Sequence, residues 1–316
     1  MTLAFIFPGQ GSQCVGMGRA LAETYSVAAR VFEEVDEALG ENLSKLMFEG
    51  PEATLTLTEN AQPALMAVSL AVMAVLESEG GLDLGSAQSK VKFVAGHSLG
   101  EYSALAAAGT FSVSDAAKLL KTRGRAMQQA VPVGEGAMAA LLGLELAVAS
   151  RVAEQASQGE ICTAANDNAN GQVVISGALA AVERAIVIAK ENGAKRGILL
   201  PVSAPFHCAL MAPAAEVMAE ALAGVRMQQP AVPLVANVTA SDVTDAAEIR
   251  RLLVEQVTGM VRWRESVLFM KGKGVQGLVE IGVGKVLSGL ARRIDGDLVA
   301  SNIGTPADVE AFLATL

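Results

Sequence analysis

The sequence predicts an α/β fold in which a smaller ferredoxin-like unit is inserted into a larger layer of strands and helices. Short apolar runs alternate with longer helical patterns, as in proteins that bury a parallel sheet between helices. Hydrophobic residues make up 52% of the 316 residues and aromatic residues only 4%, which favours Ala-rich helices packed closely on a sheet. Between residues 132 and 203 the expected elements follow the order β-α-β-β-α-β, which is the ferredoxin-like order.

The first part of the larger unit is expected to contain two buried strands separated by helices. A short apolar run at Leu3–Phe7 ends at Pro8-Gly9 and predicts a strand followed by a loop. The elements expected after it are several helices within 15–80, a strand at Val91–Ala95, and helices at 99–108 and 114–130.

The inserted unit is expected between 132 and 203, so that residues 1–131 and 204–316 together form the larger unit. Its elements are expected at Ala137–Leu142 (strand), Leu146–Gln155 (helix), Ile161–Ala164 (strand), the "NDNANG" stretch (turn), Gln172–Ser176 (strand), Ala178–Asn192 (helix) and Arg196–Leu200 (strand). The larger unit then resumes with helices at 209–223, 247–260, 264–271 and 285–294, and with strands at Pro233–Val238, Gly277–Ile281 and Leu298–Asn302.

The charge distribution makes nucleic acid a poor partner and suggests a different one. The net charge is -9, and residues 1–80 hold 11 acids against 3 bases. Bases gather instead between 262 and 293, where only Glu265 and Glu280 oppose them: Arg262, Arg264, Lys271, Lys273, Lys285, Arg292 and Arg293. This patch is either a solvated helical face or a docking surface for an acidic partner.

Cysteine usage and hydropathy predict a cytoplasmic protein without a metal site. The three cysteines, Cys14, Cys162 and Cys208, are widely spaced and fit neither a zinc site nor a disulfide framework. The first ten residues lack the basic start and cleavage site of a signal peptide. The apolar stretch at 60–76 is interrupted by polar residues, so we expect a buried helix and not a membrane span.

The stretch "VKFVAGHSLGEYSAL" at 91–105 carries the clearest chemical signal. Ser98 stands between Gly96 and Gly100, where the expected strand gives way to a helix. Gly-x-Ser-x-Gly in this context is the nucleophile-elbow pattern, in which the neighbours of the serine must lack bulk. The alternative interpretation is a glycine-flanked turn with an incidental serine.

A nucleophilic serine needs a base, and the chain has only two histidines. His97 is adjacent to Ser98 and should point away across the sharp turn. His207, in "APFHCALM", is therefore the candidate base, unless it is a structural histidine at a helix start. No acid stands out as a third triad member, so a backbone carbonyl could orient the imidazole.

Two polar residues interrupt apolar helical stripes. Arg123 falls on the stripe of the helix at 114–130, where a buried guanidinium needs either an internal acid or an anionic ligand, and the pattern leaves both open. Gln256 falls on the stripe of the helix at 247–260 and could be a structural amide. The loop "FPGQGSQ" at 7–13 follows a strand and can expose backbone N–H groups for an oxyanion hole, with Leu99 N–H as the second donor.

Together these motifs resemble the malonyl-CoA:acyl carrier protein transacylases. "FPGQGSQ", "GHSLGEYSAL", "RGRAMQ", "APFHC" and "VEQVTGMVRW" occur in the order expected of that family, over essentially the whole chain. The resemblance implies an α/β-hydrolase-like larger unit. It implies transfer of a malonyl group from malonyl-CoA to the phosphopantetheine thiol of acyl carrier protein for fatty acid synthesis, through a malonyl-serine intermediate, with no metal or bound cofactor.

The resemblance also implies roles for individual residues. These are Ser98 as nucleophile, His207 as base, Arg123 as the partner of the malonyl carboxylate, Gln10 and Leu99 as oxyanion donors, Gln256 as the residue that orients His207, and Phe206 as a bulky residue that influences the acyl group. The acidic carrier protein is expected to bind the bases of 262–293, together with Lys190, Lys195 and Arg196.

Three other functions compete with this interpretation. A serine esterase or thioesterase would share Ser98, His207 and the oxyanion hole, but would not need Arg123. An acyltransferase of polyketide synthesis would share the whole site. A scaffold that binds acyl carriers without turnover would not need every catalytic position to be filled.

Overall fold

The computed structural model describes residues 1–202 and 204–315, so the expected boundary residues 203 and 316 lie outside it. Its larger sheet has the strand order β10-β9-β1-β2-β7-β8. The strands are β1 (Leu3–Phe7), β2 (Val91–Gly96), β7 (Leu234–Val235), β8 (Asp242–Val243), β9 (Gly277–Ile281) and β10 (Val299–Ile303). All neighbours pair in parallel except β7 and β8. The structure therefore confirms the expected mixed α/β architecture with a parallel sheet.

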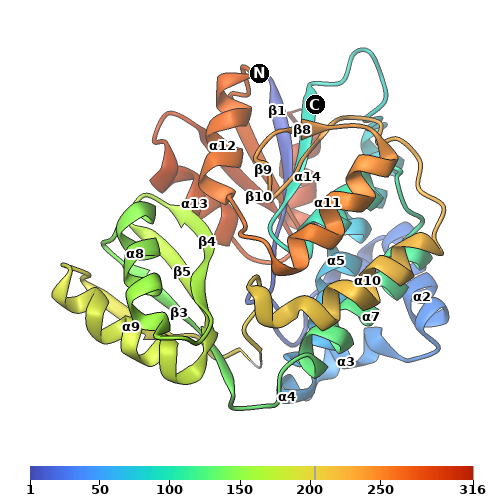
Figure 1. Ribbon diagram of the computed structural model, residues 1–316. Helices are drawn as coiled ribbons and strands as arrows, with labels where there is room; N and C mark the ends of the chain where they lie inside the picture. Colours follow the sequence, from blue (N-terminus) through green and yellow to red (C-terminus); the bar gives the residue numbers. More distant parts are fainter. Residues whose placement is uncertain (203, 316) are drawn as a thin grey trace.

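Helices cover both faces of this sheet (Figure 1). Their bounds are α1 (Arg19–Thr24), α2 (Ser26–Leu39), α3 (Leu43–Glu49), α4 (Glu52–Leu55), α5 (Thr58–Gly80), α6 (Gly100–Ala107), α7 (Val113–Gln129), α10 (Ala212–Ala223), α11 (Ala246–Thr258), α12 (Trp263–Gly272), α13 (Val286–Ile294) and α14 (Pro306–Leu313), with a 3₁₀ turn at Ala209–Met211.

Strand β1 shows how two separate cores meet at the sheet. Successive side chains of a strand point to opposite faces. Phe5 and Phe7 belong to the core formed with α2, α5 and α7, whereas Ala4 and Ile6 belong to the core formed with α12 and α13. All five residues of β1 are buried, which explains why the run reads as continuously apolar.

A second, antiparallel sheet lies beside the first, with strand order β4-β5-β3-β6. Its elements are β3 (Gly136–Leu142), α8 (Leu146–Ser157), β4 (Cys162–Ala169), β5 (Gln172–Ala178), α9 (Leu179–Glu191) and β6 (Arg196–Leu199). The chain order is β-α-β-β-α-β, as expected. The two helices and the sheet enclose a third core rich in alanine. Figure 1 shows these elements at the lower left of the molecule.

Two strand predictions are wrong, and both errors lie next to the cavity described below. The turn expected over "NDNANG" is confined to Asn170 and Gly171, because β4 continues to Ala169 and its backbone pairs with β5 and, at Asn166, with Val261 of the larger unit. The strand expected at Pro233–Val238 is only Leu234–Val235, because the backbone then turns so that Asn237 can bond to the end of β2. The sequence reading also missed β8 and α14.

Among the described residues, α5 is the one helix that is long and apolar enough to cross a membrane. In the structure 83% of its most apolar window is buried inside the protein. It packs against α2 and α7, which confirms the expectation of a buried helix at 60–76.

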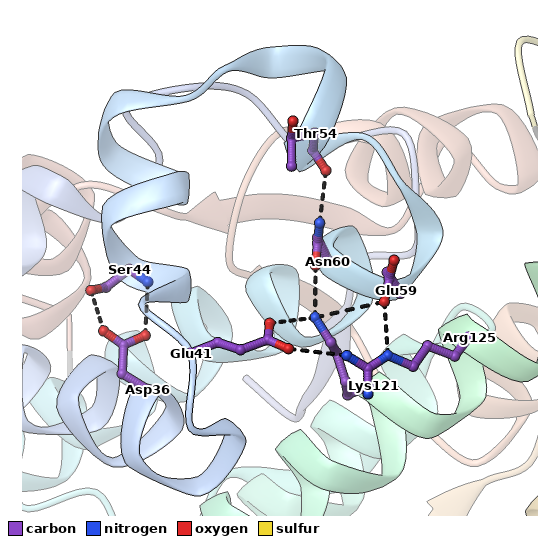
Figure 2. Close-up of polar contacts among 8 residues, drawn as sticks. All are labelled: Asp36, Glu41, Ser44, Thr54, Glu59, Asn60, Lys121 and Arg125. Carbon is purple, nitrogen blue, oxygen red and sulfur yellow. Dashed lines mark hydrogen bonds and ion pairs between the residues drawn. The ribbon is translucent and has the colours of Figure 1, made fainter.

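An ion-pair cluster joins α7 to the start of α5 (Figure 2). Lys121 is almost fully buried, and its Nζ lies 2.5 Å from a Glu41 oxygen and 2.9 Å from Asn60 Oδ1. One turn further along α7, the more exposed Arg125 bonds to Glu59 at 2.8 Å and to Glu41 at 3.0 Å. The two cations flank position 123, so the cluster fixes that part of α7 against α5.

We expect the two cations of the cluster to contribute unequally to stability. Lys121→Met leaves the buried Asn60 oxygen without its donor and should lower the free energy of unfolding by about 1–3 kcal/mol. Arg125→Met removes a half-exposed ion pair and should cost less than about 1 kcal/mol. Denaturant unfolding of the two variants measures the difference, and equal losses would contradict it.

Candidate active site

A cavity of about 500 Å³ lies where the two units meet. Its walls come from both sheets and from the segment that leads into α10. The lining residues include Gln10, Gln62, Ser98, Leu99, Arg123 and Met127 from the larger unit, Met138, Asn166, Asn168 and Val174 from the smaller one, and Phe206 and His207. The structure thus brings all the site residues predicted from the sequence to one place, with Gln256 behind the wall.

The turn that carries Ser98 is as tight as the Gly-x-Ser-x-Gly pattern predicts. Strand β2 ends at Gly96, α6 begins at Gly100, and Ser98 has a φ of 54°, in the left-handed region. A Cβ atom on Gly96 would lie 1.9 Å from the carbonyl of Gly100, and one on Gly100 would lie 2.2 Å from Phe7 O. Neither position can accept a side chain, and this fixes the serine at the end of the strand.

Ser98 and His207 form a hydrogen-bonded pair. The Ser98 Oγ atom lies 2.8 Å from His207 Nε2, and His207 Nδ1 lies 2.8 Å from the backbone oxygen of Gln256. Because a carbonyl oxygen only accepts, Nδ1 carries the proton and Nε2 is left to accept from the serine hydroxyl. This is the arrangement expected from the sequence when no triad acid is available.

The His207 imidazole is held in its neutral form. Burial, together with the positive charge of Arg123, lowers the pKa of His207 to about 3. The imidazole therefore carries no proton on Nε2 at neutral pH. The residue has a φ of 59°, so its backbone, like that of Ser98, is in the left-handed region that is uncommon for residues other than glycine.

His97 is oriented away from this pair. Its Nε2 lies 2.8 Å from Asn168 Oδ1 in β4, and its ring lies 5.7 Å from that of Trp263. The prediction that His97 points away from Ser98 is therefore confirmed, and the contact with Asn168 joins the two units beside the cavity.

Arg123 is 1% exposed and reaches the serine. Its guanidinium donates to Ser98 Oγ at 3.0 Å and to the side-chain oxygens of Gln62 and Gln256, both at 2.8 Å. All three acceptors are neutral, and Arg123 Nε has no hydrogen-bond partner among the described residues. The sequence left two partners open for Arg123, an internal acid or an anionic ligand. Within residues 1–202 and 204–315, no acid bonds directly to Arg123. A buried cation with neutral acceptors beside a nucleophile favours binding of an anion.

The positions of Gln10 and Leu99 suit an oxyanion hole. Both residues line the cavity, and Leu99 directly precedes the first turn of α6. Within the described parts of the chain, neither backbone N–H donates a hydrogen bond, so both are free for a ligand oxygen. The Gln10 side chain bonds to Thr58 Oγ1 at 3.3 Å, which anchors the loop to α5.

The sequence reading missed three polar residues that support the site. Asn237 accepts the Ser98 N–H at 2.8 Å and donates to Gly96 O at 2.7 Å, so that it braces the tight turn from outside. Gln62 holds Arg123, and Glu101 bonds to Gln256. Each is a buried polar residue in an apolar segment, which is the same signal that pointed to Arg123 and Gln256.

Among the described residues, no group of three or more His, Cys, Asp and Glu side chains could hold a metal ion.

Phe206 is 8% exposed and lines the cavity beside His207. Cys14 is exposed and lies outside the lining of this cavity.

A paired serine and histidine, two free backbone N–H groups and a buried arginine define a site for acyl chemistry at a serine. A family model described as "Acyl transferase domain" matches residues 4–288. The chain belongs to this acyl transferase family.

Named relatives cover the whole chain. A Bacillus subtilis protein named "Malonyl CoA-acyl carrier protein transacylase" is 45% identical over 99% of this chain and 97% of its own length. The crystal structure of an acyl-carrier-protein S-malonyltransferase from Bartonella henselae is 56% identical, with a TM-score of 0.96 over 100% of this chain and 99% of that one. A malonyl transacylase in complex with a type II polyketide acyl-carrier protein is 42% identical, with a TM-score of 0.95 and complete coverage of both chains.

The lowered pKa of His207 has a consequence for stability. Between pH 6.5 and about 3 the unfolded chain binds a proton at this residue and the folded protein does not, so stability is lost as pH falls through this range. We expect the free energy of unfolding to fall less steeply with falling pH in the variant His207→Gln than in the wild type. The two slopes should differ by up to about 1.4 kcal/mol per pH unit. Thermal unfolding from pH 7.5 to 4.5 measures both slopes, and parallel curves would show that His207 titrates normally.

Proposed function

We propose that this chain transfers a malonyl group from malonyl-CoA to the phosphopantetheine thiol of an acyl carrier protein. The observation that carries the proposal is Arg123, a buried cation whose guanidinium reaches the nucleophile and bonds only to neutral oxygens. An esterase for neutral substrates has no use for such a cation. The names of the full-length relatives support the same reaction.

In the first half of the reaction, His207 Nε2 takes the hydroxyl proton as Ser98 Oγ attacks the thioester carbonyl. The backbone N–H groups of Gln10 and Leu99 bind the oxygen that becomes negative, and Gln256 O holds the imidazolium in place. The carbon–sulfur bond then breaks. His207 returns its proton to the departing coenzyme A thiolate, which leaves malonyl-Ser98.

In the second half, the phosphopantetheine thiol of the carrier protein gives its proton to His207 and attacks the malonyl ester. Ser98 Oγ leaves and recovers the proton. Arg123 pairs with the malonyl carboxylate throughout, and Phe206 lies against the acyl group in the cavity. We infer no cofactor or metal for these steps, because each proton has a donor and an acceptor within the site.

We also propose the finer description of the fold. Residues 1–131 and 204–316 form an α/β-hydrolase-like catalytic unit, and 132–203 form the inserted unit. The serine turn after a central parallel strand supports the first assignment, and the separate core of β3, β4 and β5 with α8 and α9 supports the second. We propose a cytoplasmic location and a role in fatty acid synthesis, with polyketide synthesis as the alternative pathway.

For the acidic carrier protein, we propose a docking surface on the exposed bases near the junction of the two units. Of the bases expected there, Arg262 pairs with Glu265, Arg264 with the buried Asp167, and Lys271 with Asp295, so their charges are already offset.

The better candidates are Lys195 and Arg293, which are exposed and line one surface depression between the units. Lys190, Arg196 and Arg292 are exposed on the neighbouring elements. Charges at the rim of an interface act mainly on the rate of association.

We expect the purified protein to gain the mass of a malonyl group when it is mixed with malonyl-CoA, and Ser98→Ala to gain none. Acetyl-CoA should label the protein on the order of 10⁴-fold more slowly, because a site built for a charged group rejects substrates that lack it. Mass spectrometry of the intact protein measures both. Rapid hydrolysis of the adduct would support the esterase alternative.

The Arg123→Ala variant provides the control for the carboxylate assignment within the same experiment. Its rate of labelling by malonyl-CoA should fall strongly, and the ratio of its malonyl rate to its acetyl rate should decrease. A variant that keeps the full preference would exclude Arg123 as the partner of the carboxylate.

We expect the double variant Lys195→Glu/Arg293→Glu to raise the KM for the carrier protein on the order of tenfold, without changing the rate of Ser98 acylation by malonyl-CoA. The matched control is Arg30→Glu/Lys45→Glu, which reverses exposed charges on α2 and α3. Helix α2 lies on the side of the molecule opposite α9 (Figure 1). Equal effects of the two double variants would exclude the proposed surface.

A further inference from the structure

Glu101 is a fully buried carboxylate that the proposed reaction does not use. It is the second residue of α6, three residues after Ser98, and is 1% exposed. Burial of a carboxylate costs free energy unless its oxygens are hydrogen-bonded. Its position in the first turn of a helix offsets part of that cost.

Both oxygens of Glu101 face N–H donors. Oε1 accepts the backbone N–H of Asn237 at 3.2 Å, and Oε2 accepts the side-chain Nε2 of Gln256. A group that accepts on both oxygens is best satisfied as a carboxylate. Burial raises the pKa of Glu101 to about 7, while the hydrogen bonds and the charge of Arg123 act in the opposite direction.

These contacts fix which way the Gln256 amide points. Its Nε2 also donates to Ser98 O at 2.9 Å, so its Oε1 faces Arg123 Nη2 at 2.8 Å. When Glu101 is ionised, at a pH above its pKa of about 7, the amide thus lies between an anion and a cation, with its N–H toward Glu101 and its C=O toward Arg123. The reversed amide would place oxygen against the carboxylate and N–H against the guanidinium, and both contacts would be repulsive.

Gln256 also holds the base, because its backbone oxygen lies 2.8 Å from His207 Nδ1. We propose that Glu101 is a positioning residue for the acyl transfer: it orients the Gln256 amide and so gives Arg123 the acceptor that keeps its guanidinium beside Ser98. This inference rests on the proposed function, because it assigns to Glu101 an effect on selection of a carboxylate-bearing acyl group. Glu101 itself does not line the cavity.

The test compares Glu101→Gln with Glu280→Gln. Glu280 lies in β9 outside the cavity lining, is 0% exposed, and accepts the backbone N–H groups of Leu287 at 3.1 Å and Ser288 at 2.8 Å. In both variants a carboxylate that accepts two N–H groups becomes an amide with one acceptor oxygen. The measurements are the unfolding midpoint and the single-turnover rates of Ser98 acylation by malonyl-CoA and by acetyl-CoA.

We expect both variants to lose stability, but only Glu101→Gln to lose selectivity. Its malonyl-to-acetyl rate ratio should fall by on the order of tenfold or more, because Arg123 loses its fixed acceptor. A loss of folded protein lowers both rates equally and leaves the ratio unchanged, as expected for Glu280→Gln. An unchanged ratio in folded Glu101→Gln would overturn the proposal.

A double-mutant cycle tests whether Glu101 acts through Gln256. In a Gln256→Ala background, Glu101→Gln should change the rate ratio by less than about twofold, and independent multiplying effects would overturn the proposed route. If Glu101→Gln does not fold, Glu101→Asp replaces it in the test. The shorter side chain keeps the carboxylate but withdraws it from Gln256 by the length of one methylene group. That variant should lower the ratio in the same direction, and no change would again reject the proposal. A wild-type protein without any malonyl preference would instead reject the proposed function.

Discussion

The buried guanidinium of Arg123 is the constraint on which the rest of the site depends. Coulomb interactions are strong in a poorly solvated interior, so a cation placed there must be offset or must wait for an anion. This protein surrounds it with amide and hydroxyl oxygens and places the Glu101 carboxylate behind the Gln256 amide. The charge is therefore stabilised without being neutralised, and it lies beside the nucleophile.

The same cation acts on the base. Arg123 is the second cause, after burial, of the lowered pKa of His207. Under the proposed function, a substrate carboxylate paired with Arg123 would offset that charge and make the imidazole a stronger base once the substrate has bound. Substrate recognition and activation of the serine would then depend on a single charge, and the packing of α7 that holds Arg123 would affect both.

Periodicity and spacing in the sequence were enough to predict the layers of the fold and to single out Ser98, Arg123 and Gln256. The roles of Arg123 and Gln256 were implied only by the family resemblance. The strand at Leu3–Phe7, the order of the inserted unit, the tight turn at Ser98 and the polar residues on apolar stripes all follow from local rules. The errors occurred where tertiary contacts override local preference. The first four residues of "NDNANG" complete β4 and leave only Asn170 and Gly171 as the turn, because the strand backbone pairs with β5 and, at Asn166, with Val261 across the junction. Asn237 was missed because its role depends on Gly96 at the end of β2, 141 residues earlier in the chain.

The two walls of the cavity come from different sheets but share one hydrophobic core. The wall with the serine, the base and the arginine is built on the large parallel sheet, and the opposite wall, with Met138 and Val174, is built on the small antiparallel sheet. Met138 and Val174 belong to the same core as Leu99 and Met127, whereas the third core holds the side chains on the other face of β3 and β5. In this architecture the shape of the acyl pocket and the placement of the reacting groups are coupled, so natural or directed variation of the pocket must preserve the packing around the serine turn.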